Sequence, residues 1–275
     1  MMQSLDNKKK TIIIGVVVVI LLAAALAIGL STGRKGSVPA TPQPQNTVET
    51  TAAATETVAP TEAPVGSHHI ENIVPALAQG EMKAGCETHA VCSLLKTLGY
   101  EIDDFDFADY YIEVHPVYKD EETGYMEGPD MYSGFAGSPY AGWGIYAPAM
   151  AKHINSYLKD VNSNQKAYFL EGESLPDLCE EYIDKDIPVA VWATTNMEEP
   201  YAFDTWTVNY VDENAKYKLG DSFSWPAHEH CLTLCGYDEK YYYFSDSVIG
   251  DISQFERALA EERYEQLGKQ AIVVK

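Results

Sequence analysis

The chain has 275 residues and carries 41 Asp and Glu against 19 Lys and Arg, which gives a formal net charge of -22. This charge excludes nucleic acids and anionic lipid surfaces as docking partners, because both would repel so acidic a protein. The length accommodates one ordinary domain of about 200 residues together with further segments.

The N-terminal segment is predicted to hold the protein in a membrane. Residues 11–31 contain no charged side chain, and about 20 apolar residues are enough to cross a bilayer as a helix. Lysines occupy positions 8–10, so the positive-inside rule predicts a cytoplasmic tail over residues 1–10. We therefore expect a signal anchor, a cell-membrane location and an extracellular C-terminal domain. Cleavage as a signal peptide, at the alanines of positions 23–25, is the alternative.

Two regions of different composition follow the apolar run. Residues 32–69 are rich in Thr, Pro and Ala and lack Phe, Trp and Tyr. Such a composition cannot bury enough apolar surface to fold, so it predicts a disordered stalk. Residues 70–275 contain all the aromatic side chains of the chain and are predicted to form one globular domain.

Within this domain, helices are predicted first and strands later. Apolar residues at helical spacing predict helices over residues 86–98, 104–111, 146–158 and 175–183. Short apolar runs predict strands over residues 167–170, 188–193, 231–236, 241–245 and 271–274. Residues 115–144 are predicted as a long irregular region, and residues 207–224 as a surface hairpin. This order indicates an α+β fold in which N-terminal helices pack on an antiparallel sheet.

Cys86 is the most informative cysteine because it follows Gly85 and opens the first apolar helix. Free amides and the positive dipole end of a helix favour a thiolate, which lowers the pKa of the thiol, and they can bind an oxyanion. We therefore predict that Cys86 is a nucleophile. The other four cysteines are predicted to be small buried hydrophobic residues and not disulfide partners: Cys92, Cys179, Cys231 and Cys235.

A thiol nucleophile needs a histidine base within hydrogen-bond reach, and the base needs an acceptor that orients it. His230 begins an apolar strand and Asp246 ends the next one. If these strands form a hairpin, the register places Asp246 opposite His230. His228, on the same strand face, is the second candidate base. The remaining histidines are not expected to act as the base: His68, His69, His89, His115 and His153.

Several sequence blocks follow one another over nearly all of residues 70–275: Gly85-Cys86-Glu87 with residues 94–100, then residues 137–139, 144–148, 188–194, 229–238 and 245–250. In this order they resemble the C39-like cysteine peptidase family, the bacterial double-glycine-peptidase relatives within the papain-like clan. The resemblance implies a papain-like cysteine peptidase fold. It also implies that Cys86 is the nucleophile, that His230 is the general base and acid, and that Asp246 orients His230.

The resemblance further implies a glutamine before the cysteine, whose amide completes the oxyanion hole. Gln79 is the candidate, although its neighbours match the family poorly. The chain also has Ser247 where relatives often have proline after the aspartate. Together these residues predict a membrane-anchored extracellular thiol peptidase, acting on peptide or peptidoglycan-peptide bonds, with a cell-wall amidase as a variant.

The alternative function is a catalytically silent surface domain that binds peptide or cell-wall material. No cofactor is expected, because the chain lacks a Walker-type glycine loop. No metal is expected either, because the adjacent side chains of His228, Glu229 and His230 alternate between two strand faces. The sequence assigns no oligomeric state.

Overall fold

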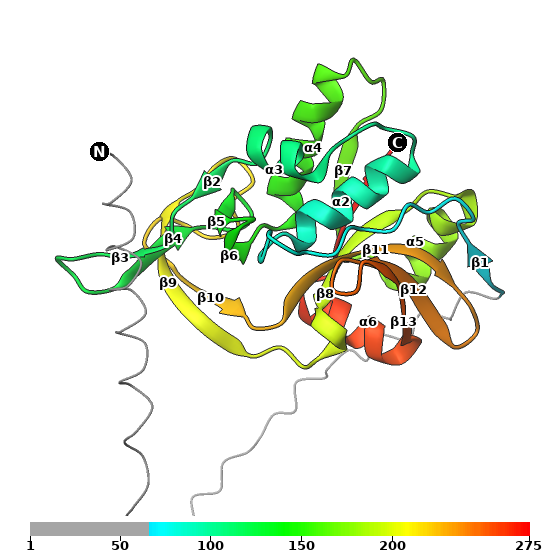
Figure 1. Ribbon diagram of the computed structural model, residues 1–275. Coiled ribbons are helices and arrows are strands. Elements are labelled where there is room, and N and C mark those ends of the chain that lie inside the picture. Colours follow the sequence, from blue (N-terminus) through cyan, green and yellow to red (C-terminus); the bar gives the residue numbers. More distant parts are fainter. Residues whose placement is uncertain (1–65) are drawn as a thin grey trace, which may run out of the picture. The chain divides into compact units, whose positions relative to one another are not determined.

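The computed structural model describes residues 66–275 (Figure 1). Within this range there are five α-helices: α2 (Cys86–Thr97), α3 (Asp104–Tyr110), α4 (Ala147–Asp160), α5 (Leu175–Glu181) and α6 (Arg257–Gln266). Two 3-10 helices are η1 (Ile183–Lys185) and η2 (Thr195–Met197). The strands are β1 (His68–His69), β2 (Val114–His115), β3 (Tyr118–Lys119), β4 (Met126–Pro129), β5 (Phe135–Ser138), β6 (Ala141–Gly144), β7 (Ala167–Glu171), β8 (Val189–Thr194), β9 (Ala202–Tyr210), β10 (Ser222–Pro226), β11 (Glu229–Tyr237), β12 (Tyr241–Asp246), β13 (Asp251–Glu256) and β14 (Gln270–Val274).

One seven-stranded antiparallel sheet forms the centre of the described domain. Its strands lie in the order β13-β12-β11-β8-β14-β7, and β1 pairs with β11. Two smaller sheets, β10-β9-β4-β3 and β2-β5-β6, each contain one parallel pair. The expected mixture of helices with mostly antiparallel strands is therefore confirmed.

Side-chain alternation along the central strands divides the core into two layers. On β8, Ala190 and Trp192 pack with α2 and α4, whereas the alternate residues of this strand pack with α5 and α6. Figure 1 shows α2 and α4 above the central sheet and α6 below it. The sheet is thus covered by helices on both faces. Helix α6 was not predicted, because only two of its buried residues are apolar, Ala260 and Tyr264, and these make no clear apolar stripe.

Helix α2 carries the predicted nucleophile. Its N-cap, Gly85, provides no side-chain cap, and a Cβ atom on Gly85 would lie 2.6 Å from the Cβ of Met82. The tight turn before the helix therefore requires glycine. The helix ends before Gly99, which has a φ of 89°. Thr233 of β11 donates from Oγ1 to the carbonyl of Ala90 at 2.7 Å, which holds the helix against the central sheet.

Residues 115–144 are not one irregular region, as predicted, but contain four short strands, β3 to β6. Asp130 directly follows β4, and its buried carboxylate accepts hydrogen bonds from the backbone N–H groups of Tyr132, Lys216 and Tyr217. These strands are two to four residues long, which is too short to show an alternating apolar pattern.

The predicted hairpin between Trp206 and Trp225 is observed. Its strands, β9 and β10, pair antiparallel with Ser222 opposite Thr207. Trp206 is buried and donates from Nε1 to the carbonyl of Pro129 at 2.9 Å. The hairpin is therefore anchored in the core of the domain through this indole.

The structure contradicts the predicted cell-membrane location. The longest helix within residues 66–275, α4, has 14 residues, and a helix needs about 20 apolar residues to cross a bilayer. No helix of this range is both long and apolar enough to do so. The predicted tail, residues 1–10, and anchor, residues 11–31, lie outside the described residues, as does most of the predicted stalk, residues 32–69.

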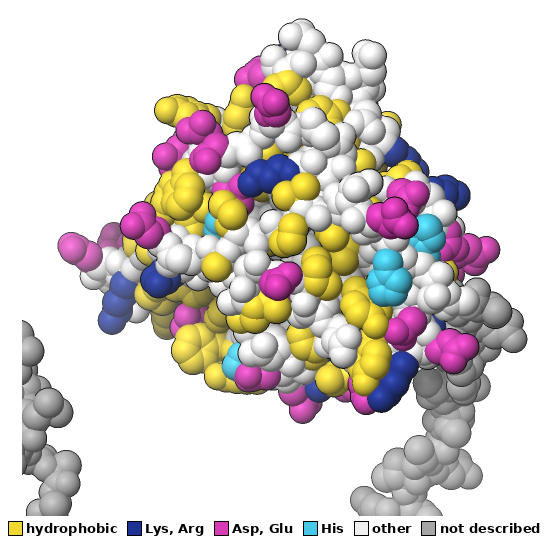
Figure 2. Space-filling model, turned by 45° about the vertical axis from the view of Figure 1, so that its right-hand side comes forward, with side chains coloured by type: hydrophobic (Ala, Val, Ile, Leu, Met, Phe, Trp, Pro, Cys, Tyr) yellow, Lys and Arg dark blue, Asp and Glu magenta, His cyan; other side chains and the backbone are white. Residues whose placement is uncertain are grey.

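Acidic side chains are spread over the surface of the domain. On the face drawn in Figure 2, Asp and Glu are scattered between hydrophobic and uncharged residues and do not gather into one patch. This face therefore presents no concentrated acidic surface that would by itself mark a docking site for a basic partner.

Candidate active site

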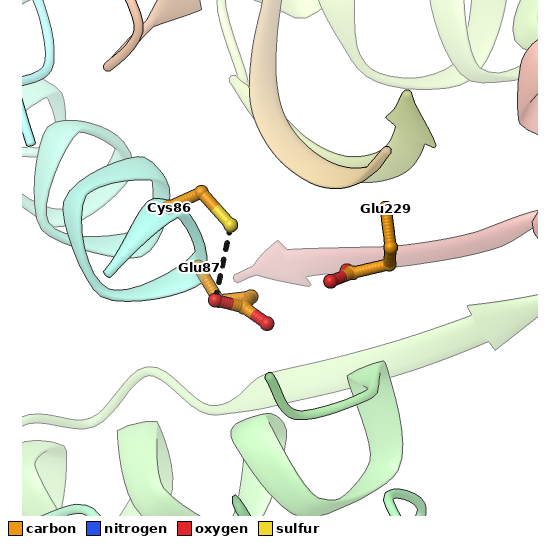
Figure 3. Close-up of side chains that lie close together, drawn as sticks. All are labelled: Cys86, Glu87 and Glu229. Carbon is orange, nitrogen blue, oxygen red and sulfur yellow. Dashed lines mark hydrogen bonds between the residues drawn. The ribbon is translucent and has the colours of Figure 1, made fainter. Parts of the chain in front are cut away.

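Cys86 lies at the start of α2 with 6% of its surface exposed. Its thiol donates a hydrogen bond to Glu87 Oε2, with an Sγ to O distance of 3.1 Å (Figure 3). The sulfur also lies beside the backbone N–H of Cys231 in β11. The helix start and the beginning of β11 therefore meet at this thiol. All five cysteines, which fall within the described residues, are free and buried.

The surroundings of Cys86 do not produce the low pKa that its helix position predicts. Burial raises the pKa of the thiol well above its ordinary value, and the carboxyl groups of Glu87 and Glu229 raise it further. The N–H of Cys231 lowers it, but by less. Burial, followed by the two acidic neighbours, therefore sets the direction of the shift at this thiol. A helix dipole acts best on an accessible group at the helix end.

Two buried carboxyl groups accompany the thiol, and no role was predicted for either. Glu87 accepts a hydrogen bond from the backbone N–H of Ile145 through Oε1 at 2.8 Å. Burial raises the pKa of Glu87 to about 7, although that N–H lowers it. Glu229, at the first position of β11, has two buried carboxylate oxygens without a hydrogen-bond partner. Burial and nearby Glu87 raise the pKa of Glu229 well above its usual range.

A glycine allows the two carboxyl groups to share this space. Gly144 ends β6 with a φ of 146°, and a Cβ atom added to it would collide with Glu87 Oε1 and lie 2.9 Å from Glu229 Oε2. Both carboxyl groups therefore point at the same part of the backbone.

His230 and Asp246 are brought together by the central sheet. His230 Nε2 lies 2.9 Å from Asp246 Oδ1, and both side chains are buried. The same carboxylate oxygen accepts the backbone N–H of Val248 at 2.9 Å. An imidazole held by a buried carboxylate through one nitrogen leaves its other nitrogen to exchange a proton with a reacting group.

The register of the hairpin differs from the predicted one by two residues. Thr233 lies opposite Ser245, and a bulge shifts the pairing between Leu234 and Gly236, so Asp246 lies level with Leu232 and not with His230. A shift of two residues keeps side chains on the same face of a sheet. The diagonal contact between His230 and Asp246 therefore still forms.

The structure does not join the thiol to the imidazole by a hydrogen bond among the described residues. The two neighbours of His230 on β11, Glu229 and Cys231, act on the thiol together with Glu87. The Cys86 side chain is turned toward Glu87 instead. His230 nevertheless directly precedes Cys231, whose backbone N–H lies beside the Cys86 sulfur.

Gln79 is half-buried and lies beside the turn that follows Asp246. Its backbone N–H donates to the carbonyl of Ser247 at 3.0 Å, and its carbonyl accepts from the N–H of Met82 at 2.8 Å. In residues 66–275 no hydrogen bond is formed by the Gln79 side-chain amide. Its backbone thus connects the segment before Cys86 to the strand end that holds Asp246.

Other histidines occupy positions that do not suit the base. His89 is buried, and its Nδ1 lies 2.6 Å from Asp104 Oδ2. His228, the second candidate, precedes β11 with a φ of 67°, and its Nε2 lies 3.5 Å from Glu198 Oε2. It is therefore not on the strand face of His230, because the chain takes a left-handed turn at this residue.

His153 provides a pH test of the core. Burial, followed by the charge of nearby Lys152, lowers the pKa of His153 to about 4. A histidine with a lowered folded pKa stabilises the fold above its unfolded pKa of about 6.5, and this stabilisation is lost as the pH falls toward 4. We expect the free energy of unfolding to decrease by about 3 kcal/mol over this interval. Urea unfolding of the His153→Gln variant should lack this part of the pH dependence; an unchanged dependence would assign the loss to other groups.

A family model described as the Peptidase_C39 like family matches residues 71–272. The chain belongs to this family. The match spans nearly the whole described domain, including Cys86, His230 and Asp246.

The chain is also similar to a curated bacterial protein and to a solved structure. The "Uncharacterized protein YvpB" of Bacillus subtilis (strain 168) is 26% identical over 192 residues, which cover 69% of this chain and 68% of YvpB. A crystal structure of a proposed C39-like peptidase from Bacillus anthracis has a TM-score of 0.61 and 25% identity, and it covers 76% of this chain and 97% of that protein. The C39-like resemblance read from the sequence blocks is therefore confirmed.

Proposed function

We propose that this C39-like protein is a cysteine peptidase that hydrolyses peptide or related amide bonds, with a papain-like arrangement of Cys86, His230 and Asp246. The observation that carries the proposal is the buried His230–Asp246 pair, located where β11 meets the thiol at the start of α2. Family membership supports peptidase chemistry, and a peptide or peptidoglycan peptide is the proposed substrate.

In the proposed reaction, the Cys86 side chain turns from Glu87 toward His230 and gives its proton to the imidazole. The sulfur attacks the carbonyl carbon, and backbone N–H groups at the start of α2 stabilise the oxyanion, assisted by the Gln79 amide. His230 then gives the proton to the leaving amine as the C–N bond breaks. Water, deprotonated by the same imidazole, attacks the thioester carbon and restores the thiol. Asp246 orients His230 throughout.

A catalytically silent binding domain is the second candidate function. It is favoured by one observation, the hydrogen bond of the thiol to Glu87 in a site that raises the thiol pKa. In that case the thiol would react no faster than the other buried cysteines.

Alkylation of the full chain with iodoacetamide at neutral pH separates the two functions. Because a His230-paired thiol has thiolate character, we expect Cys86 to be alkylated at least roughly tenfold faster than the other cysteines, measured by mass spectrometry of peptide fragments. His230→Ala should remove this excess, and the matched variant His89→Ala should retain it. Equal, slow alkylation of all five cysteines would favour the silent domain, and rapid labelling in His230→Ala would assign the base elsewhere.

A further inference from the structure

Two acidic side chains converge on the thiol of Cys86, from two elements that are far apart in the sequence. The Cys86 sulfur and one carboxylate oxygen each from Glu87 and Glu229 lie within 4.8 Å of one another, and all three residues are buried. Figure 3 shows Cys86 and Glu87 at the end of α2, with the Glu229 carboxyl group approaching from the opposite side.

Glu229 lacks the partner that a buried carboxyl group requires. Only 6% of its surface is exposed, and neither carboxylate oxygen forms a hydrogen bond of normal geometry. The nearby indole N–H of Trp225, also without a partner, lowers the pKa of Glu229 but by less than burial and Glu87 raise it. Burial of an uncompensated carboxylate is costly, so native proteins pair such groups or bind a cation with them. Two other buried carboxylates of the described domain are paired: Asp104 with His89 and Lys96, and Asp246 with His230.

We propose that Cys86, Glu87 and Glu229 form a binding site for a single Zn²⁺ ion. Zinc accepts both thiolate sulfur and carboxylate oxygen, and it often takes three protein ligands with an open fourth position. Calcium and magnesium prefer sites made of oxygen alone, so the sulfur selects against them. Binding releases to solvent the thiol proton together with any proton held by the carboxyl groups of Glu87 and Glu229, and the ion compensates the charges of the thiolate and the two carboxylates.

The spacing of the ligand atoms suits this ion. Zinc-ligand distances of about 2.0 to 2.3 Å place the ligand atoms of a tetrahedral site roughly 3.5 Å apart. The Cys86 sulfur and Glu87 Oε2 are already 3.1 Å apart, and Glu229 is within reach of both. Ligand atoms that now lie within 4.8 Å of one another need to approach by roughly 1 Å to close the site around the ion.

Zinc in this site would hold the sulfur that the peptidase reaction needs. Inhibition by Zn²⁺, reversed by a chelator, follows if the proposed function is correct. The binding itself does not depend on that function, so metal binding and peptidase activity can fail separately.

Titration of the full chain, prepared without a histidine tag, with Cd²⁺ tests the site. Cadmium replaces zinc and gives an ultraviolet charge-transfer band when a thiolate binds it. We expect a band that saturates at one equivalent, is displaced by Zn²⁺ and is absent in Cys86→Ser. Glu229→Gln should weaken binding by roughly 100-fold or more, because even outer partners of a metal site contribute 10- to 100-fold.

Two matched variants control for surface sites and other thiols. Cys235→Ser removes a buried thiol elsewhere and Glu71→Gln removes an exposed carboxylate; both should keep the band and the affinity. Thermal unfolding of each metal-free variant checks that it is folded. A wild-type protein without the band at saturating Cd²⁺, or a band that persists in Cys86→Ser, would overturn the proposal. So would unchanged affinity in a folded Glu229→Gln variant.

Discussion

Replacement of His230 by alanine is expected to lower kcat/KM for peptide hydrolysis by at least roughly 10³-fold. In the proposed reaction this imidazole takes the thiol proton, protonates the leaving amine and activates water. Because these residues act as one catalytic unit, removal of one of them removes most of the rate enhancement of the whole unit. The measurement is the rate of cleavage of a peptide library by the wild-type and variant chains.

The matched control for this experiment is His228→Ala. His228 lies two residues before His230, outside β11, with its side chain near Glu198, so its loss should leave kcat/KM within about twofold. The assignment of the base would be wrong if His228→Ala abolished cleavage while His230→Ala retained it.

Replacement of Asp246 by alanine is expected to lower the free energy of unfolding by about 3 kcal/mol, because removal of one partner from a buried pair leaves the other uncompensated. It should also lower kcat, since the imidazole loses its orienting acceptor. Asp246→Asn keeps the size of the side chain and a carbonyl oxygen for the Val248 N–H. We therefore expect the Asn variant to recover much of the stability but little of the activity. Urea unfolding and peptide cleavage measure the two effects separately.

The pH dependence gives this prediction a second measurement. Burial raises the pKa of Asp246, but the opposing hydrogen bond and charge of His230, together with the Val248 N–H and Ser253, leave it below the ordinary value of 3.8. A carboxyl group with a lowered folded pKa stabilises the fold above its unfolded pKa of about 3.9, and this is lost as the pH falls through the folded pKa. The Asn variant should lack this loss in acid. If the variant and wild type lose stability in parallel there, Asp246 is not held by His230 in solution.

The helix and strands that carry the proposed catalytic residues can be predicted from the sequence, because each is specified by a pattern of neighbouring residues. An apolar stripe followed by Gly99 predicts α2, and two apolar runs around a polar turn predict β11 and β12. The register between these strands was predicted two residues away from the observed one. Beside the turn Tyr237 pairs with Tyr242, a difference of three residues, and the bulge between Leu234 and Gly236, which has no local sequence signature, reduces the difference to two. The His230–Asp246 contact survives because the error is an even number of residues.

The acidic surroundings of Cys86 could not be predicted in the same way. Glu87 reads as a favourable acidic residue in the first turn of a helix, and Glu229 reads as one of three adjacent polar residues before a strand. Their convergence depends on the docking of α2 against β11 and on Gly144, which leaves room for both carboxyl groups. These contacts join distant parts of the chain, so helix position alone predicted a lower thiol pKa than the folded site gives.

The most direct test of the peptidase proposal is cleavage of a peptide library by the full wild-type chain and by Cys86→Ala, in the presence of a chelator to keep the thiol free of metal. If the proposal is correct, we expect cleavage products from the wild type, a covalent acyl-enzyme on Cys86 in mass spectra of the reaction, and at least a roughly 10³-fold loss of cleavage in Cys86→Ala. Cleavage at the wild-type rate by Cys86→Ala would contradict it.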